Sequence, residues 1–141
     1  MATSIQVTFD CADPDRLARF WVAVLGYEIP DPPEGFATWD DWATAMRIPG
    51  DQWNAARAIE DPDGTGPRLF FQRVPEPKTV KNRVHLDLRA EDTMAGEIDR
   101  LVALGASVLQ EHRLPHAAWT VMRDPEGNEF CVASGPGDAT T

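Results

Sequence analysis

Apolar and polar residues alternate in two short stretches of the chain. Residues 5–10 read IQVTFD, and residues 82–92 read NRVHLDLRAED. Alternation with a period of two residues predicts a half-buried strand that has one apolar face and one polar face. On the second predicted strand, the polar face carries three chemically active side chains, which are His85, Asp87 and Arg89.

The two stretches belong to an internal repeat that contains no gap. A shift of 79 positions (85 − 6 = 79) superposes Gln6 on His85, Asp13 on Asp92, and Gly26 on Gly105. Apolar residues recur at helical spacing between each aspartate and the following glycine. Each aspartate is predicted to cap the start of a helix, and each glycine is predicted to form the left-handed turn after it.

The later part of each half predicts further strands. Residues 60–74 and residues 123–134 both place an Asp-Pro-acid-Gly turn before an apolar run. The first half also contains an additional segment, TWDDWATAM, in which Thr38 is predicted to cap a short helix. Each half therefore has the pattern of a βαβββ module.

We predict a single α+β domain over residues 1–141, built from two tandem βαβββ modules. The first module spans about residues 4–75, a connector spans about residues 75–82, and the second module spans about residues 83–134. Strands from both modules are expected to form a curved, cup-shaped mixed sheet, with the helices outside it.

The charge of the chain excludes some partners. Lys and Arg number 13 against 23 Asp and Glu, which gives a formal net charge of −10. This charge repels phosphate backbones and anionic membrane surfaces, so we expect neither nucleic acid nor membrane as a partner. The first residues lack a basic start and an apolar run, and only two cysteines are present. We therefore expect a cytoplasmic protein whose cysteines are thiols.

The polar faces of the predicted strands define a candidate ligand site. Strand alternation places the following residues on the inner face of the cup: Gln6, Thr8, Asp10, Phe70, Gln72, His85, Asp87, Arg89, Glu129 and Cys131. Trp39, Trp42 and Trp119 are candidates to line the same site, since aromatic rings commonly line pockets for flat or apolar ligands. His112 and His116 are predicted to lie in a loop near the pocket edge.

Structural roles remain open for each candidate. His85 can instead be a structural histidine whose ring is hydrogen-bonded to a backbone group or a carboxylate. Asp87 can pair with either His85 or Arg89. Cys131 is more often a small buried residue than a nucleophile. Core packing also explains some of the tryptophans. A cluster of inward polar groups nevertheless indicates a ligand or a connected hydrogen-bond network.

Three motifs resemble the vicinal oxygen chelate superfamily. They are VTFDCADPDRLARFWVAVLGY, RVHLDL and DPEGNEFCV, and the resemblance extends over roughly residues 5–133. Within the superfamily, the chain is most similar to the glyoxalase-like branch, which is related to bleomycin-resistance-type proteins. The resemblance implies the two-module fold and a pocket for a small molecule. It also implies a homodimer.

The resemblance further implies one divalent metal, held by four side chains from the first and last strands of each half. The matching positions are Gln6, Gln72, His85 and Cys131. Metal-dependent members usually carry glutamate where this chain has Gln72 and Cys131, so a hard ion loses its carboxylate ligands here. Zn²⁺ remains the alternative, because imidazole and thiolate are legitimate zinc ligands. We expect no functional metal and no other cofactor.

Two classes of function remain open at this stage. The first is a binding protein with an eroded metal site that sequesters an antibiotic or a metabolite. The second is an enzyme of the lyase, isomerase or dioxygenase type, in which His85 acts as general acid or base, Asp87 tunes it, and Arg89 or Gln72 holds a substrate oxygen. Ordinary glyoxalase I activity is not expected, because it relies on charged metal ligands that this sequence lacks.

Overall fold

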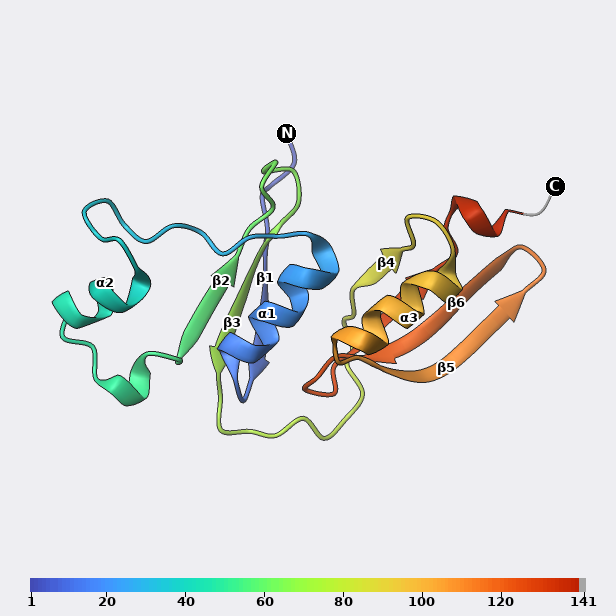
Figure 1. Cartoon of the computed structure of the whole chain (residues 1–141). Helices are drawn as coiled ribbons and strands as arrows, with labels where there is room; N and C mark the ends of the chain where they lie inside the picture. Colours follow the sequence, from blue (N-terminus) through green and yellow to red (C-terminus); the bar gives the residue numbers. More distant parts are fainter. Residues whose placement is uncertain (140–141) are drawn as a thin grey trace. The chain divides into compact units, whose positions relative to one another are not determined.

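The computed structural model describes residues 1–139 and divides the chain into two compact units (Figure 1). The first unit spans Met1–Pro77, and the second begins at Lys78, within the predicted connector. The fold is mixed α+β, as predicted, and its strands form two small mixed sheets, one in each unit. Among the described residues, no helix is long and apolar enough to cross a membrane.

The first unit contains a three-stranded sheet in the order β1-β3-β2. Its elements are β1 (Gln6–Cys11), α1 (Pro14–Leu25), α2 (Trp39–Ala45), the 3₁₀ turn η1 (Gly50–Gln52), β2 (Ala56–Ile59) and β3 (Arg68–Arg73). Strands β1 and β3 are parallel, and β2 is antiparallel to β3. The strand predicted directly after the first helix is reduced to a single bridge between Glu28 and Glu60.

Helix α1 begins and ends where the sequence predicts. The Asp13 carboxylate accepts a hydrogen bond from the Arg16 backbone N–H at 3.2 Å, and Gly26 is left-handed with φ of 70°. The apolar side of α1 is buried, and Trp21 packs against Phe9 with ring centroids 5.6 Å apart. Phe9 in turn stacks on Phe71 at 5.2 Å. The core of the first unit therefore lies between α1 and one face of its sheet.

The second unit forms a complete βαβββ module, with a four-stranded sheet in the order β4-β7-β6-β5. Its elements are β4 (Asp87–Arg89), α3 (Met94–Leu104), β5 (Ser107–Leu114), β6 (Ala117–Arg123), β7 (Glu129–Ala133) and the 3₁₀ turn η2 (Pro136–Asp138). Strands β4 and β7 are parallel, whereas the other neighbours are antiparallel. Leu101 of α3 and Met122, Phe130 and Val132 of the sheet are fully buried or nearly so.

The start of α3 differs by one residue from the prediction that Asp92 caps it. Thr93 is the cap, and its hydroxyl accepts a hydrogen bond from the Gly96 backbone N–H at 3.1 Å. The C-terminal segment adds a second acceptor, because the Asp138 carboxylate binds the backbone N–H of Met94 at 2.7 Å and that of Gly135 at 3.0 Å. The prediction was wrong because two adjacent residues are both good caps, and the repeat alone selected the first.

The predicted start of the first strand in each unit is also corrected. Ile5 and Val84 were expected to pack on the helix side, but they are 69% and 83% exposed. Both lie outside the strands, since β1 begins at Gln6 and β4 begins only at Asp87. Alternation thus predicts the strand faces correctly, but it extends the strands beyond the residues that pair.

Candidate active site

The candidate active site lies on the open face of the second sheet, which we define as the face opposite α3. Strand register places Asp87 of β4 beside Cys131 of β7. The Cys131 backbone N–H donates to the Leu86 carbonyl at 2.9 Å, which fixes this register. Because side chains alternate along a strand, Phe130 and Val132 are buried toward α3, whereas Cys131 is on the open face.

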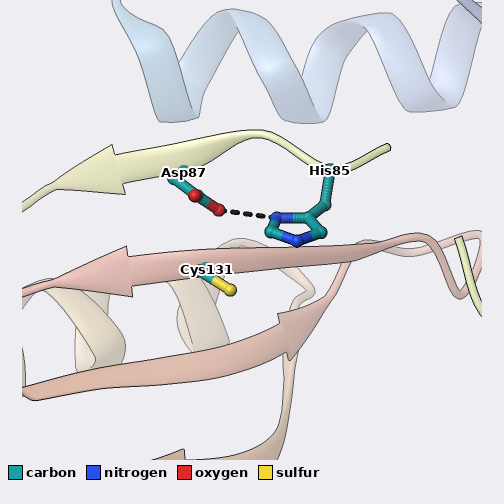
Figure 2. A group of neighbouring side chains, drawn as sticks. All are labelled: His85, Asp87 and Cys131. Carbon is teal, nitrogen blue, oxygen red and sulfur yellow. Dashed lines mark hydrogen bonds and ion pairs between the residues drawn. The ribbon is translucent and has the colours of Figure 1, made fainter. Parts of the chain in front are cut away.

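His85 and Asp87 form a hydrogen-bonded pair on this face (Figure 2). The His85 Nδ1 atom lies 2.6 Å from Asp87 Oδ1, and the two side chains are 37% and 63% exposed. With Asp87 ionised, the imidazole donates through Nδ1–H, so Nε2 is the ring nitrogen that can exchange a proton with a ligand. The sequence leaves His85 and Arg89 as alternative partners for Asp87, and the structure pairs it with His85.

Cys131 is held as a thiol beside this pair. Burial and then the neighbouring Asp87 carboxylate raise the pKa of Cys131 above its ordinary value. A raised pKa disfavours the thiolate, which is the nucleophilic form of cysteine. Cys131 itself is half-buried.

A cross-strand aromatic pair lies on the same open face. His112 of β5 is directly opposite Trp119 of β6, and their rings stack with centroids 5.1 Å apart and planes 14° apart. The expectation that His112 lies in a loop was wrong, because β5 continues to Leu114 and the hairpin turn is shorter than the polar sequence suggested. Arg89 is exposed and is opposite Ala133 in the register of β4 and β7.

Glu129 is placed differently from the other candidates. It is only 6% exposed, and its carboxylate binds the Lys78 ammonium at 3.2 Å and the Asn82 backbone N–H at 2.9 Å. Burial opposes its ionisation, but the hydrogen bonds from Asn82 and Lys78 outweigh it, so the pKa of Glu129 is lowered. Glu129 thus holds residues 78–82 against β7 and has both oxygens occupied.

The candidates of the first unit gather on the open face of its own sheet. Gln6 accepts a hydrogen bond from Arg68 at 2.6 Å, and Gln72 donates to Asp10 at 2.7 Å. Thr8 is opposite Phe70 in the register, and the Arg68 guanidinium lies 5.6 Å from the Phe70 ring centroid. Sequence reasoning missed Arg68, although its position two residues before Phe70 on β3 signals the same face.

Trp39 and Trp42 lie on α2, outside the sheet of the first unit (Figure 1). Their rings meet edge to face with centroids 5.5 Å apart, and the Trp39 indole N–H donates to the Pro30 carbonyl at 2.8 Å. Trp39 is 40% exposed. The two rings therefore form an aromatic surface of their own.

Comparisons with known proteins decide the family. The glyoxalase-like domain family matches residues 6–133, which is most of the chain. The chain belongs to this family. A search of curated protein sequences finds no match.

Solved structures of glyoxalase-like proteins share the fold. A FosX fosfomycin resistance protein from Listeria monocytogenes is similar with a TM-score of 0.64 and 11% identity, over 96% of this chain and 92% of that chain. Lactoylglutathione lyase from Agrobacterium tumefaciens is similar with a TM-score of 0.57 and 17% identity, over 96% and 95%. A glyoxalase/bleomycin resistance protein/dioxygenase family enzyme from Burkholderia phytofirmans has a TM-score of 0.62 and 15% identity, over 91% and 94%. The resemblance to the vicinal oxygen chelate superfamily is confirmed.

The metal implied by the glyoxalase-like fold can be tested against the donor atoms present. His85, Asp87 and Cys131 offer a nitrogen, an oxygen and a sulfur atom within 4.8 Å of one another. These donor types suit Zn²⁺ and not a hard ion. A zinc ion would have to replace the His85–Asp87 hydrogen bond, so two of the three donors are already bonded to each other.

A groove of about 770 Å³ lies elsewhere in the second unit. It is lined by residues of α3, of the β5–β6 hairpin and of the C-terminal segment, including Met94, Arg113, His116 and Asp138. His116 lies in the β5–β6 turn, as predicted, but the groove that it borders is on the α3 side of the sheet and is not the inner face of the predicted cup. It is separate from the His85–Asp87 pair, which does not line it.

Proposed function

We propose that this glyoxalase-like protein binds a small organic molecule on the open face of its second sheet and that His85 transfers a proton on that molecule. The observation that supports the proposal is the 2.6 Å contact between His85 Nδ1 and Asp87 Oδ1. A carboxylate in this position fixes the imidazole tautomer and orientation, which is the arrangement that a general base needs.

The proposed step is proton transfer at a carbon next to a carbonyl group. His85 Nε2 accepts the proton, the C–H bond breaks, and its electron pair becomes part of an enolate. The imidazolium then returns the proton to the same carbon or to a neighbouring atom, so the reaction is an exchange or an isomerisation and needs no oxidant. Asp87 stabilises the imidazolium because its negative charge lies 2.6 Å from Nδ1.

Solvent exchange tests this function without knowledge of the natural substrate. Small 2-hydroxy ketones and 2-oxo acids are incubated with the protein in deuterium oxide, and loss of the proton signal at the α-carbon is followed by NMR. We expect His85→Ala to remove the catalysed exchange, a loss of about 10²–10⁴-fold for a general base. Asp87→Asn is expected to lower the rate, because the imidazolium loses its counter-charge.

Asp99→Asn is the matched control for these variants. Asp99 is an exposed carboxylate on α3, in the same unit but on the other side of the sheet. Its substitution is expected to leave the exchange rate unchanged. Full exchange by a folded His85→Ala variant would contradict the proposal.

A second candidate function is binding without turnover. The amide groups of Gln6 and Gln72 occupy two positions where the superfamily holds metal, and each is bonded to a neighbouring side chain. Together with the Trp39–Trp42 surface, this favours a site that sequesters a ligand. Under this alternative, a compound shifts the NMR signals of the protein but shows no exchange at its α-carbon.

Three further expectations belong to the proposal. The protein is expected to work without a resident metal, as a homodimer, and in the cytoplasm. The first of these rests on the donor chemistry of His85, Asp87 and Cys131 described above. The other two rest on the family resemblance and on composition.

A further inference from the structure

The open face of the second sheet places an aromatic pair close to the His85–Asp87 pair. Trp119 lies on β6, between β5 and β7 in the sheet. On the β5 side its neighbour is His112, whose ring is stacked on the indole. One face of the indole is therefore covered by a ring from the same sheet.

On the β7 side the neighbour of Trp119 is Ala133. Its side chain is a single methyl group, so it fills little of the space beside the indole. Strands β6 and β4 flank β7 and are about 9.6 Å apart, or two strand spacings, so one planar ring fits over Ala133 between Trp119 and Arg89, which is opposite Ala133 in the register of β4 and β7. The indole is half-buried, and its open side is thus bordered by the smallest side chain that a strand commonly carries.

This slot adjoins the proposed proton-transfer group. Ala133 is two residues beyond Cys131 on β7, so both side chains are on the same face and about 6.6–6.8 Å apart along the strand. Cys131 is opposite Asp87 in the register, and Asp87 binds His85. The slot and the His85–Asp87 pair are therefore on the same face, and His85 precedes Arg89, the residue opposite Ala133, by four residues, about 13 Å along the chain. A ligand that occupies both would have to extend beyond its stacked group.

We propose that the slot over Ala133 binds a flat, unsaturated or aromatic group of the ligand, stacked on Trp119 opposite His112. The proposal names the ligand class of the site described above, and only its link to catalysis rests on the proposed function. The stacking of His112 on Trp119 is equally well explained as a cross-strand pair that only stabilises the sheet. That explanation assigns no role to the small side chain of Ala133. The size of residue 133 therefore distinguishes the two explanations.

The test compares two probes that differ in flatness. Benzoate and cyclohexanecarboxylate have the same charge and nearly the same size, but only benzoate has a planar ring. Binding to the full chain is measured by ¹⁵N NMR titration of the backbone amide signals of residues 131 and 133, which remain in the variants at positions 119 and 133. We expect benzoate to bind about 2- to 10-fold more tightly than cyclohexanecarboxylate, which is the range that aromatic stacking supplies.

Substitutions then test whether the preference for benzoate arises at the slot over Ala133. Ala133→Leu is expected to abolish the preference for benzoate, because the larger side chain fills the slot. Ala103→Leu is the matched control, since Ala103 is exposed on α3 in the same unit. If Ala133→Leu does not fold, Trp119→Leu is expected to lose the preference and Trp119→Phe to keep part of it.

Equal binding of the two probes would overturn the inference, as would an unchanged preference in Ala133→Leu or Trp119→Leu. The outcome is separable from the proposed proton transfer. His85→Ala is expected to keep the preference for benzoate, because stacking does not require the imidazole. A protein that prefers benzoate but shows no His85-dependent exchange would retain the slot and lose the catalytic proposal.

Discussion

Asp87 acts on two neighbouring side chains at once. It binds the imidazole of His85, and it adds to the effect of burial in raising the pKa of Cys131. Both effects come from the negative charge of Asp87, which lies on β4 opposite Cys131 of β7. The reactivity of Cys131 therefore reports on the charge of Asp87.

Removal of this charge should make Cys131 more reactive. In Asp87→Asn the pKa of the thiol falls, because the carboxylate no longer opposes the thiolate, although burial still does. We expect alkylation by iodoacetamide at mildly alkaline pH to become several-fold faster, as followed by mass spectrometry of the Cys131 peptide. Cys11 is buried in the first unit and is the internal control. Unchanged alkylation of Cys131 would contradict the electrostatic effect assigned to Asp87.

Glu129 gives the stability of the protein a defined pH dependence. The pKa of Glu129 is lower in the folded chain than in the unfolded chain, so the unfolded state takes up its proton first as the pH falls. The stabilisation is therefore complete above the usual carboxyl pKa and is lost as the pH falls through the lowered value. Glu129→Gln should reduce the free energy of unfolding by about 1–3 kcal/mol at neutral pH.

Urea unfolding at several pH values measures this effect. The difference between the unmodified chain and Glu129→Gln should shrink as the pH becomes acidic. Glu91→Gln is the control, because Glu91 is an exposed residue of the same unit. A difference that stays constant with pH would contradict the role of the Glu129 charge.

Metal retention tests the donor chemistry of the same site. After incubation with Zn²⁺ and desalting, we expect less than one equivalent of zinc per chain by elemental mass spectrometry. The reason is that the imidazole of His85 is already bonded to Asp87. Stoichiometric zinc that is lost in His85→Ala would show instead that these residues hold a metal.

At the scale of the residue, alternation along the sequence predicts which side chains share a face. It groups His85 with Asp87, and Gln6 with Asp10, on the polar faces that the structure describes. It does not predict which pairs bond, because that depends on rotamers and on the neighbouring strand. The burial of Glu129 was missed for this reason, since its partners come from the connector at residues 78–82.

At the scale of the element, the caps of the helices are readable from the sequence to within one residue. Asp13, Gly26 and Gly105 have the predicted roles. The cap of α3 was not predicted, because Asp92 and Thr93 are both good caps and nothing local in the sequence distinguishes them. The length of β5 was not predicted, because its polar residues look like those of a loop. Contacts with η2 and β6 determine both features in the folded chain.

The corrected cap of α3 makes a direct prediction. Thr93→Ala removes the hydroxyl that accepts from Gly96, so we expect a loss of about 0.5–2 kcal/mol in the free energy of unfolding. Asp92→Ala should have a smaller effect, since the Asp92 backbone and not its carboxylate binds Gly137. Thermal unfolding of both variants measures the difference. A larger loss for Asp92→Ala would restore the original assignment.

At the scale of the whole molecule, each of the two sheets formed by residues 1–139 ends in edge strands that pair on one side only within their own unit. In the second unit, the edge strand β5 exposes Val108, Leu109 and Leu114 by 52%, 42% and 50%. Exposed apolar edges favour association with another strand. We therefore expect a homodimer by sedimentation equilibrium, and a shift toward monomer in Leu109→Lys. A monomer at all concentrations of the unmodified chain would contradict this expectation.

The contact between Asp138 and the start of α3 has a practical consequence for work with this protein. Asp138 lies in η2, after the last strand of the second sheet, and its carboxylate accepts a hydrogen bond from the backbone N–H of Met94. A shortened form that stops at Ser134 would lose that acceptor and expose the first turn of α3. Any shortened or labelled form of the protein should therefore keep Pro136–Asp138 intact and undisturbed.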